Sequence, residues 1–396
     1  ENRYRVAPMN EPSLLIYAPR ETLAGESRCA LTPESAARLS KLGLRVEFEA
    51  GHGQAAGISD AELVAAGAAA VADPAAALGA ADIALRLHPP AAESLRAQKR
   101  GSAAIGFFDP FNRGDLVRAA AEAGVRAISM ELIPRTTLAQ KMDALSSQAS
   151  IAGYVAVILA AERLPKVFPM MMTPAGTLAP ARVFVIGAGV AGLQAIATAR
   201  RLGARVEAYD TRPVVEEQVQ SLGAKFVKFD LGETGQTKDG YAKALTEEQL
   251  RRQREAMARH CAGSDVVIAA AQVFGRRAPV IVTDDMIRGM KPGSVVVDLS
   301  VESGGNVEGI VADREETRHG VRILPFARLA ARAARHASQM YASNLANFIE
   351  HFWDKKAKRP DWRAEDEILR GCQVTLDGAI VHAGVNERLA AAGKGA

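Results

Sequence analysis

The stretch VFVIGAGVAGLQAIATARRLGARVEAYDTR, residues 183–212, decides the fold. It begins with a short apolar strand, continues with Gly187, Gly189 and Gly192 in G-x-G-x-x-G order, and ends a second strand at Asp210. The three glycines suit a tight turn, the close approach of a pyrophosphate and close packing of a helix on a strand. The order strand, glycine loop, helix, strand predicts a dinucleotide-binding βαβ unit, with the pyrophosphate on the helix N-terminus.

The acidic residue after the second strand indicates which dinucleotide fits. Asp210 follows Gly192 by 18 residues, and a carboxylate at that strand end can accept bonds from both hydroxyls of the adenosine ribose. It would repel a 2′-phosphate, which favours NAD(H) over NADP(H). Arg212 leaves the alternative open, because a nearby arginine can accommodate that phosphate. A tight turn with no nucleotide is the purely structural alternative.

The same alternation of strands and helices runs through two parts of the chain. One series spans residues 14–136 and the other about 180–325, and both predict doubly wound parallel sheets. Thr32, Pro33 and Gly43 mark the start and end of one helix. Near Pro134 the rhythm changes, and the following residues predict one long helix up to about Leu164.

The C-terminal part predicts a return to the first sheet. Asp377-Gly378, between alternating apolar residues, is typical of a tight hairpin. We expect an α/β protein with two Rossmann-like domains, joined by long helices and separated by a ligand-binding cleft. The predicted domains are residues 14–136 with 338–396, and residues 140–335.

Composition limits the classes of function. The 396 residues carry 49 basic and 45 acidic side chains without a Lys/Arg block, which argues against nucleic-acid binding. No apolar run approaches the ~20 residues that cross a bilayer, and no signal-peptide pattern is present, so we expect a soluble cytoplasmic chain. Cys29, Cys261 and Cys372 form no CxxC pair and predict buried or incidental thiols. We predict no metal site.

A strip of neutral polar residues precedes the glycine loop. In RTTLAQKMDALSSQASIAGY, residues 135–154, helical spacing places Gln140, Asp143, Ser146 and Ser147 on one face. Such a strip suits neither a packed core nor a charged solvent face, so it predicts a ligand contact. Alternatively, the strip only packs the helix that links the two domains against its neighbouring domain, and Ser146 and Ser147 donate to carbonyl groups of the preceding helical turn.

An acid/base group for a dehydrogenase is hard to find among the histidines. Most dehydrogenases of small hydroxy or amino acids place such a group beside the nicotinamide. Of the seven histidines, His88 in ALRLHPP is the one candidate that could reach a cleft. Structural roles are expected for His260 and His351.

The segment PRETLAGESRCALTP, residues 19–33, together with the glycine loop, resembles the alanine dehydrogenase/pyridine nucleotide transhydrogenase family. The resemblance covers about residues 14–382. Five further segments resemble the NAD(H)-binding alpha subunit of the proton-translocating transhydrogenases: QKMDALSSQASIAGY, FPMMMTPAGT, DTRPVVEEQVQSLGAKF, GYAKALTEEQ and VVVDLSVESGGN.

Departures from the family pattern also discriminate. Where alanine dehydrogenases carry a lysine and a histidine, this chain reads RLHPP and GFFDPFN, although Arg28 matches their substrate-carboxylate arginine. An amino-acid substrate is therefore not expected. An alanine-type dehydrogenase remains the enzymatic alternative, and an NAD-binding sensor or scaffold is the alternative from another class.

The resemblance assigns roles to the polar strip. It implies that Arg135, Gln140, Asp143 and Ser146 hold the nicotinamide ring facing NADP(H) on a partner subunit. Hydride passage between two nicotinamides requires no proton, but it does require both rings at roughly 3–3.5 Å with water excluded. The glycine-rich segment KFDLGETGQTKDGYAKALTEE, residues 228–248, predicts an exposed loop that ends in a helix, with a passive surface loop as the alternative. The resemblance implies that this loop closes over NAD(H) through Tyr241. The nucleotide-binding residues that it implies are Gly187, Gly189, Val190, Gly192, Asp210, Thr211, Arg212, Gly240 and Gln272.

VVVDLSVESGGN retains the family residues Asp298, Glu302 and Asn306. Asp298 either contributes to the site or only caps the turn that follows its strand.

For the assembly, the resemblance implies a homodimer that passes hydride from NADH to NADP⁺ on a partner subunit. It also implies NADP(H)-binding and membrane-spanning partner subunits, which would hold the chain at the cytoplasmic face of the inner membrane.

Overall fold

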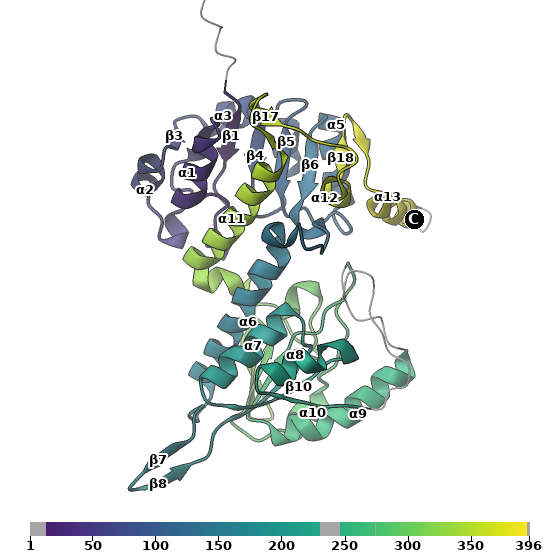
Figure 1. Cartoon of the computed structure of the whole chain (residues 1–396). Helices are drawn as coiled ribbons and strands as arrows, with labels where there is room; N and C mark the ends of the chain where they lie inside the picture. The colour runs from purple at the N-terminus through teal and green to yellow at the C-terminus, as the bar shows by residue number, and fades with distance from the viewer. Residues whose placement is uncertain (1–12, 230–245, 274, 394–396) are drawn as a thin grey trace, which may run out of the picture. The chain divides into compact units, whose positions relative to one another are not determined.

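The computed structural model describes residues 13–229, 246–273 and 275–393. Contacts between Cα atoms divide the chain into two compact units (Figure 1). The first unit comprises the residues up to Leu145 together with those from Ala334 onward, and the second comprises Ser146–Ala333. Each unit is described by itself below.

The first unit is built on a six-stranded parallel sheet with strand order β3-β2-β1-β4-β5-β6. Strands β1, β4 and β5 are buried along their whole length, as expected for a sheet covered on both faces. The strands are β1 Leu15–Ala18, β2 Arg45–Glu49, β3 Ala69–Val71, β4 Ile83–Leu85, β5 Ala103–Gly106 and β6 Arg126–Ser129. The helices are α1 Pro33–Lys41, α2 Asp60–Ala65, α3 Pro74–Ala80, α4 Ala92–Arg96 and α5 Gly114–Ala123, with 3-10 turns η1 Gln54–Ala56, η2 Met130–Leu132 and η3 Gln140–Met142.

The C-terminal segment completes this first unit. Its hairpin β18–β19 turns at Asp377 and Gly378, both with positive φ, so the predicted tight turn is confirmed. The hairpin lies against β6, because the N–H of Val374 donates to the carbonyl of Ala127 at 2.8 Å. The elements are α11 Ala334–Phe352, β16 Trp353–Asp354, β17 Arg359–Pro360, α12 Glu367–Cys372, β18 Thr375–Leu376, β19 Ala379–Ile380 and α13 Ala383–Gly393.

The second unit holds a seven-stranded sheet with strand order β11-β10-β9-β12-β13-β15-β14, parallel except for the β14–β15 pair. The strands are β9 Arg182–Ile186, β10 Arg205–Tyr209, β11 Lys225–Phe226, β12 Val266–Ala269, β13 Val295–Asp298, β14 Glu316–Arg318 and β15 Val321–Leu324, with a separate hairpin of β7 Met171–Thr173 and β8 Gly176–Leu178. The helices are α6 Ala144–Arg163, α7 Val190–Arg201, α8 Glu216–Ser221, α9 Glu247–Gly263 and α10 Asp284–Arg288, with 3-10 turns η4 Pro213–Val215, η5 Val301–Ser303 and η6 Leu329–Ala333.

Two apolar cores lie on opposite faces of this sheet. Alternate residues of β9 divide between them: Val183 and Val185 belong to one core, and Phe184 and Ile186 to the other. Helices α6, α7 and α8 supply the first core, and α9 and α10 supply the second. The predicted doubly wound architecture is therefore confirmed in each unit.

Local start and stop signals act as the sequence indicates. Thr32 caps α1 in a reciprocal capping box with Ser35, Pro33 is the first helical residue, and Gly43 just beyond the end has φ +89°. Thr246 caps α9 in the same way with Gln249, so the predicted helix after the glycine-rich loop is confirmed.

The helix predicted from about residue 141 begins later than expected. Residues 140–142 form the 3-10 turn η3, Asp143 has the non-helical ψ of 89°, and α6 begins at Ala144. Aspartate is among the residues preferred immediately before a helix, which accounts for the break. The prediction that Gln140, Asp143 and Ser146 share one face of a single helix is therefore wrong.

Helix α6 also differs from the expected absence of a long apolar run. Within the described residues, its 20 residues are long and apolar enough to cross a membrane by length and composition. However, Val155, Ala156, Val157 and Ala160 pack into the first core of the second unit. The core helix of a globular protein passes the same test.

Candidate functional site

Two glycines of the loop after β9 are required by the fold itself. Gly187 has φ +96°, and a Cβ there would lie 2.8 Å from the carbonyl carbon of Ala270. A Cβ on Gly192 would overlap the carbonyl oxygen of Gly187. These contacts seat helix α7 directly on the end of β9, as the G-x-G-x-x-G spacing predicts.

Gly189 differs from Gly187 and Gly192, because a Cβ there would meet no atom of the described residues within 4 Å. Its φ of −76° suits any residue, so neither packing nor backbone conformation requires glycine. Gly189 precedes the first turn of α7, and no side chain caps that turn. Unpaired N–H groups and the helix dipole favour an anion there. An open approach to this helix end fits a pyrophosphate passing over Gly189 and Val190.

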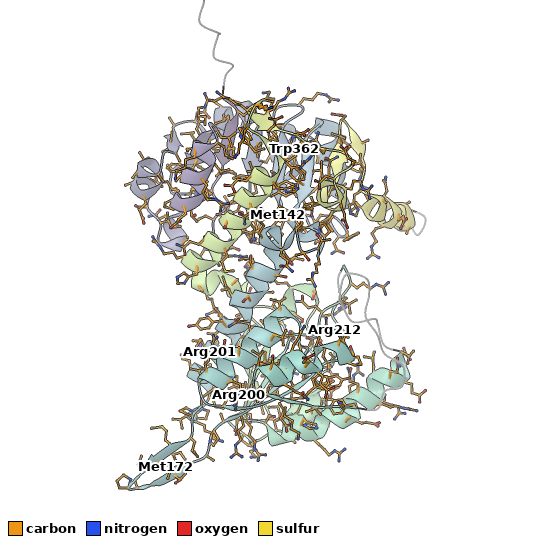
Figure 2. The ribbon with its side chains drawn as sticks, in the orientation of Figure 1. Met142, Met172, Arg200, Arg201, Arg212 and Trp362 are labelled. Carbon is orange, nitrogen blue, oxygen red and sulfur yellow. The ribbon has the colours of Figure 1, made fainter. Side chains whose placement is uncertain are left out.

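Asp210 lies directly after β10 and is bound to the glycine loop. Its Oδ2 accepts a hydrogen bond from the N–H of Ala188 at 2.8 Å. The carboxylate also accepts bonds from Nε and Nη2 of Arg212, both at 2.9 Å, and Asp210 is only 9% exposed. Ribose hydroxyls that bind this carboxylate would replace part of the Arg212 contact. Figure 2 labels Arg212 on the segment after β10, and Thr211 lies between the paired residues.

The loop after β12 faces the glycine loop at the point where the strand order reverses. Strands β9 and β12 are neighbours, and Gly187 contacts Ala270, so the two loops diverge from one point. Ligands of open α/β sheets bind at such a switch point. Gln272 lies on this loop with an exposed side chain, and its Nε2 donates to the carbonyl of Leu299 at 3.3 Å.

Asn306 holds the loop after β12 in place. Its Oδ1 accepts from the N–H of Ala271 at 3.0 Å, and its Nδ2 donates to the carbonyls of Ala271 and Pro279, both at 2.9 Å. The side chain of Asn306 is buried and cannot bind water, so these three hydrogen bonds satisfy its amide group. Asn306 is therefore a positioning residue for the loop that carries Gln272.

Asp298 caps the turn after β13. Its carboxylate accepts bonds from the N–H groups of Ser300 and Asn306 at 2.7 Å and of Val307 at 2.9 Å. Burial raises the pKa of Asp298, while these bonds oppose the rise. The capping role considered from the sequence is confirmed, and Glu302 likewise accepts a bond from the N–H of Arg328.

Within the second unit, α6 approaches the glycine loop. A Cβ on Gly153 would overlap the carbonyl oxygen of Ala191, so the two helices touch where α7 begins. The Ser150 hydroxyl also donates to Oε1 of Gln194 at 3.4 Å. Ser146 lies seven residues before Gly153, roughly 10 Å along the helix axis. Ser146 therefore belongs to the same unit as Gly187, Gly189, Asp210 and Gln272, and its contact with a nucleotide remains a prediction.

Arg135, Gln140 and Asp143 belong to the first unit. The turn η3 is anchored there, because the Lys141 carbonyl accepts from Nδ2 of Asn344 at 2.9 Å and of Asn347 at 2.7 Å. Met142, labelled in Figure 2, is fully buried, whereas Gln140 and Arg135 are exposed. Contact of these residues with a nicotinamide remains a prediction. Tyr241 and Gly240 lie outside the described residues.

The carboxyl edge of the first sheet carries a buried ionic cluster. Glu26 accepts from Nε and Nη2 of Arg28 at 2.9 and 2.7 Å, and His88 Nε2 lies 2.5 Å from the same carboxylate. Burial pushes the pKa of Glu26 upward, but the bonds from Arg28 and His88 outweigh it and lower the pKa to about 2. Glu26 thus binds both Arg28, which would bind the carboxylate of an amino-acid substrate, and His88, which would act as its acid or base.

Sequence reasoning missed Glu26, and it named Asn306 without giving it a role. Glu26 stands in the quoted segment PRETLAGESRCALTP, where its spacing of two from Arg28 signals a local ion pair. Asn306 follows two glycines with positive φ, Gly304 and Gly305, which turn the chain back toward the sheet edge. An asparagine after such a turn is a signal for hydrogen bonding to backbone groups.

Histidines and cysteines away from these clusters have structural contacts. His260 pairs with Glu207 at 2.9 Å and stacks on Phe184, and His351 pairs with Asp366 at 3.3 Å, as expected for structural histidines. The three cysteines are buried, which confirms the prediction for them.

Comparison with known proteins agrees with this arrangement. Residues 17–152 match the family described as Alanine dehydrogenase/PNT, N-terminal domain, and residues 156–383 match its C-terminal domain. The chain belongs to the alanine dehydrogenase/PNT family. It is 42% identical over 374 residues to the first part of NAD(P) transhydrogenase subunit alpha of Rhodospirillum rubrum, covering 93% of this chain and 97% of that protein.

Alanine dehydrogenases are less similar to this chain than the transhydrogenases are. Identity to alanine dehydrogenase of Halomonas elongata is 31% over 296 residues, covering 74% of each protein. The crystal structure of transhydrogenase from Sinorhizobium meliloti matches with a TM-score of 0.83 and 43% identity, covering 93% of this chain and 100% of that chain. An L-alanine dehydrogenase matches in fold, with a TM-score of 0.79 at 21% identity, covering 96% and 99%. These values favour the transhydrogenase branch over the alanine dehydrogenases.

The contrast between Gly189 and Gly192 gives a test of the nucleotide site. Gly189→Ala should change the free energy of unfolding by no more than about 1 kcal/mol, because the position is open. It should weaken NADH binding at least about tenfold by placing a methyl group under the pyrophosphate. Gly192→Ala is the control and should lose at least ~2 kcal/mol of stability through overpacking. Calorimetric titration and thermal unfolding measure both, and unchanged NADH affinity in Gly189→Ala would contradict the assignment.

The Asp210–Arg212 pair predicts how nucleotide preference is set. Arg212→Gln removes the contact that ribose hydroxyls must displace, so NADH should bind up to about tenfold more tightly, a change of ~1.4 kcal/mol. NADPH should bind more weakly, because the cation nearest its 2′-phosphate is lost. Arg201→Gln, at an exposed position of α7, is the control and should change neither affinity. Weaker NADH binding in Arg212→Gln would show instead that the arginine contacts the nucleotide.

Proposed function

We propose that this chain is the peripheral NAD(H)-binding subunit of a proton-translocating transhydrogenase. It would bind NADH and pass hydride directly to NADP⁺ held by a partner subunit. The observation that carries the proposal is the open helix end at Gly189 beside the Asp210 carboxylate, which fits a dinucleotide with unmodified ribose hydroxyls. The similarity to transhydrogenase alpha subunits supports it.

The chemistry would come from NAD(H), which supplies hydride at its nicotinamide ring. The protein would bind and orient that ring and exclude water. Neutral groups such as Gln140 and Ser146 would fix the carboxamide, while Asp143 and Arg135 brace the segment and Tyr241 closes over the nucleotide. Hydride transfer between two nicotinamides needs no general acid or base. Neutral side chains such as those of Gln140 and Ser146, which can position a ring by hydrogen bonds, agree with that requirement.

The buried cluster of the first unit argues against an amino-acid dehydrogenase. A substrate carboxylate would have to displace Glu26 from Arg28, although that ion pair is buried and bidentate. His88 also shares the Glu26 carboxylate, so it is not available as an independent acid or base. The alanine-type alternative therefore has its expected groups engaged within the chain itself.

Partner subunits follow from the names of the relatives. The Rhodospirillum rubrum relative is named as the first portion of a subunit alpha, so its enzyme has further portions, and this chain covers 70% of the subunit alpha of Cereibacter sphaeroides. We place the NADP(H) site and the membrane-spanning region on such partners, and proton movement through them would drive the reaction. The chain itself would lie on the cytoplasmic side and reach the membrane through these partners.

The exposed hairpin β7–β8 supports a homodimer. It belongs to neither main sheet, and Figure 1 shows it projecting from the rest of the second unit. Met170, Met172 and Leu178 are 58%, 77% and 51% exposed. An isolated two-stranded ribbon is only marginally stable in water, and its apolar side chains require a covering surface. A second copy of this chain would supply that surface.

Sedimentation velocity tests the homodimer. The wild-type chain should sediment as a dimer at micromolar concentration, and the double variant Met171→Asp/Met172→Asp should sediment as a folded monomer. Val311→Asp is the control, since it places the same charge at an exposed apolar position elsewhere in the second unit. A monomeric wild-type chain, or a double variant that still dimerises, would overturn the assignment.

Reconstitution tests the proposed reaction. The chain should be mixed with an isolated NADP(H)-binding transhydrogenase domain, and reduction of an NAD analogue by NADPH followed by absorbance. Turnover should require both proteins, and Ser146→Ala should lower the rate while leaving NADH affinity nearly unchanged. NADH formation from L-alanine by this chain alone would instead support an amino-acid dehydrogenase. The absence of either reaction from a chain that binds NADH would support the sensor or scaffold alternative.

A further inference from the structure

A cavity of about 450 Å³ lies at the amino edge of the sheet in the first unit. Its lining comes from Leu14, from the starts of β4 and β5, and from residues 354–362 of the C-terminal segment. Sites for small molecules are commonly 300–1,000 Å³, so the volume suits a small organic ligand. The strands run away from this cavity toward the edge that carries Arg28 and His88, which makes the two places distinct.

The walls of the cavity are partly apolar and partly aromatic. Leu14, Ile83, Ala103 and Pro360 line it together with Trp362, which Figure 2 labels. The Trp362 ring packs near the rings of Phe348 and Phe352, with centroids 6.2 and 5.6 Å apart, so its position is fixed. Its indole N–H donates no hydrogen bond within the part of the chain that the structure describes.

Two of the three lining carboxylates are already satisfied. Asp82 binds Nζ of Lys99 at 2.7 Å and accepts the N–H of Leu15 at 2.8 Å. Asp354 accepts the N–H groups of Ala357 and Lys356, and these bonds lower its pKa. Asp361 is exposed at the rim.

Two guanidinium groups in the lining have no such partners. Arg100 and Arg359 line the cavity and are exposed, and neither guanidinium donates a hydrogen bond or forms an ion pair within the part of the chain that the structure describes, although the charge of Arg359 helps to lower the pKa of Asp354. The lining as a whole has three basic side chains, Lys99, Arg100 and Arg359, and three acidic ones, Asp82, Asp354 and Asp361, so its formal charge is zero. Because Asp82 and Asp354 already accept hydrogen bonds, the two guanidinium groups are the charged donors left for an anionic group.

Ser102 supplies a second, independent observation. Ser102 is only 3% exposed and lines the cavity, and its Oγ has no hydrogen-bond partner among the residues that the structure describes. The N–H and carbonyl of Ser102 are both paired, to Lys99 and Arg126, so only the hydroxyl is left. A buried hydroxyl without a partner costs about 1–3 kcal/mol, and a ligand oxygen in the cavity would recover that cost.

We propose that this cavity binds a small organic anion, with a phosphate or carboxylate head between Arg100 and Arg359 and an apolar or aromatic body against Trp362. The Ser102 hydroxyl would donate to the same ligand. The site lies wholly in the first unit, whereas the dinucleotide residues Gly189 and Asp210 lie in the second. The proposal therefore stands or falls independently of the transhydrogenase assignment.

Intrinsic fluorescence tests this site directly. The two tryptophans of the chain, Trp353 and Trp362, both lie in the segment that borders the cavity, so their emission reports on it. The full chain should be titrated with phenyl phosphate, benzoate and inorganic phosphate at low salt. We expect a saturable change for phenyl phosphate or benzoate, with the tighter of the two identifying the head group. Saturating NAD⁺ should leave this affinity unchanged.

Variants separate binding from folding. The double variant Arg100→Gln/Arg359→Gln should weaken binding at least tenfold, while Arg118→Gln, at an exposed position on α5, should bind as wild type does. Ser102→Ala should weaken binding several-fold without lowering Tm, because the hydroxyl makes no bond in the fold. Three results would overturn the proposal: no saturation by either organic anion below about 10 mM, wild-type affinity in the double arginine variant, or equally tight binding of inorganic phosphate.

Discussion

The second unit depends on three backbone contacts that only glycine permits. Gly187 lies against Ala270, Gly192 against the Gly187 carbonyl, and Gly153 against the Ala191 carbonyl. These contacts bring the end of β9, the start of α7 and the middle of α6 to one point of the sheet edge. Packing at this density leaves no room for a methyl group, so any side chain there would move a whole helix. The positions of Gly187, Gly189 and Gly192, which are predicted to bind a nucleotide, follow from that arrangement.

The two units use the same strand order for different purposes. Each sheet reverses its order beside its first strand, between β1 and β4 in one and between β9 and β12 in the other. In the second unit, the loops at this point leave an open helix end beside a carboxylate. In the first, Glu26, Arg28 and His88 fill the corresponding edge with their own ion pairs. A shared fold therefore does not carry a shared chemistry, which depends on how the edge residues are paired.

Much of this could be predicted from the sequence, because local signals and the global fold agree. Thr32, Asp377 and the glycine loop each specify a backbone conformation through their own chemistry, and the structure has each as expected. The break at Asp143 was not predicted, since apolar periodicity continued through it and outweighed a single capping residue. The role of Gln140 and its neighbours rests on the family resemblance, because pattern alone cannot show which surfaces a ligand touches.

The contact of His88 with Glu26 and the bonds of Asn306 to the loop that carries Gln272 could not be predicted from the sequence. Both depend on side chains brought together by tertiary structure, across 62 residues for Glu26 and His88 and 35 residues for Asn306 and Ala271. Spacing rules describe neighbours along a helix or strand, and they do not describe which loops converge at a sheet edge. The polar contacts that complete a site are therefore the portion that requires coordinates.

The divided first unit has a consequence for synthesis on the ribosome. Strand β6 is bordered by the segment around Gln373 and Thr375, so its outer edge stays unpaired until that segment has emerged. The second unit is one continuous stretch of chain, so its sheet can form while the outer edge of β6 is still unpaired. An unpaired edge strand is a template for pairing with other nascent chains. Until the residues around Thr375 are synthesised, this edge is thus the part of the first unit most exposed to pairing with another chain.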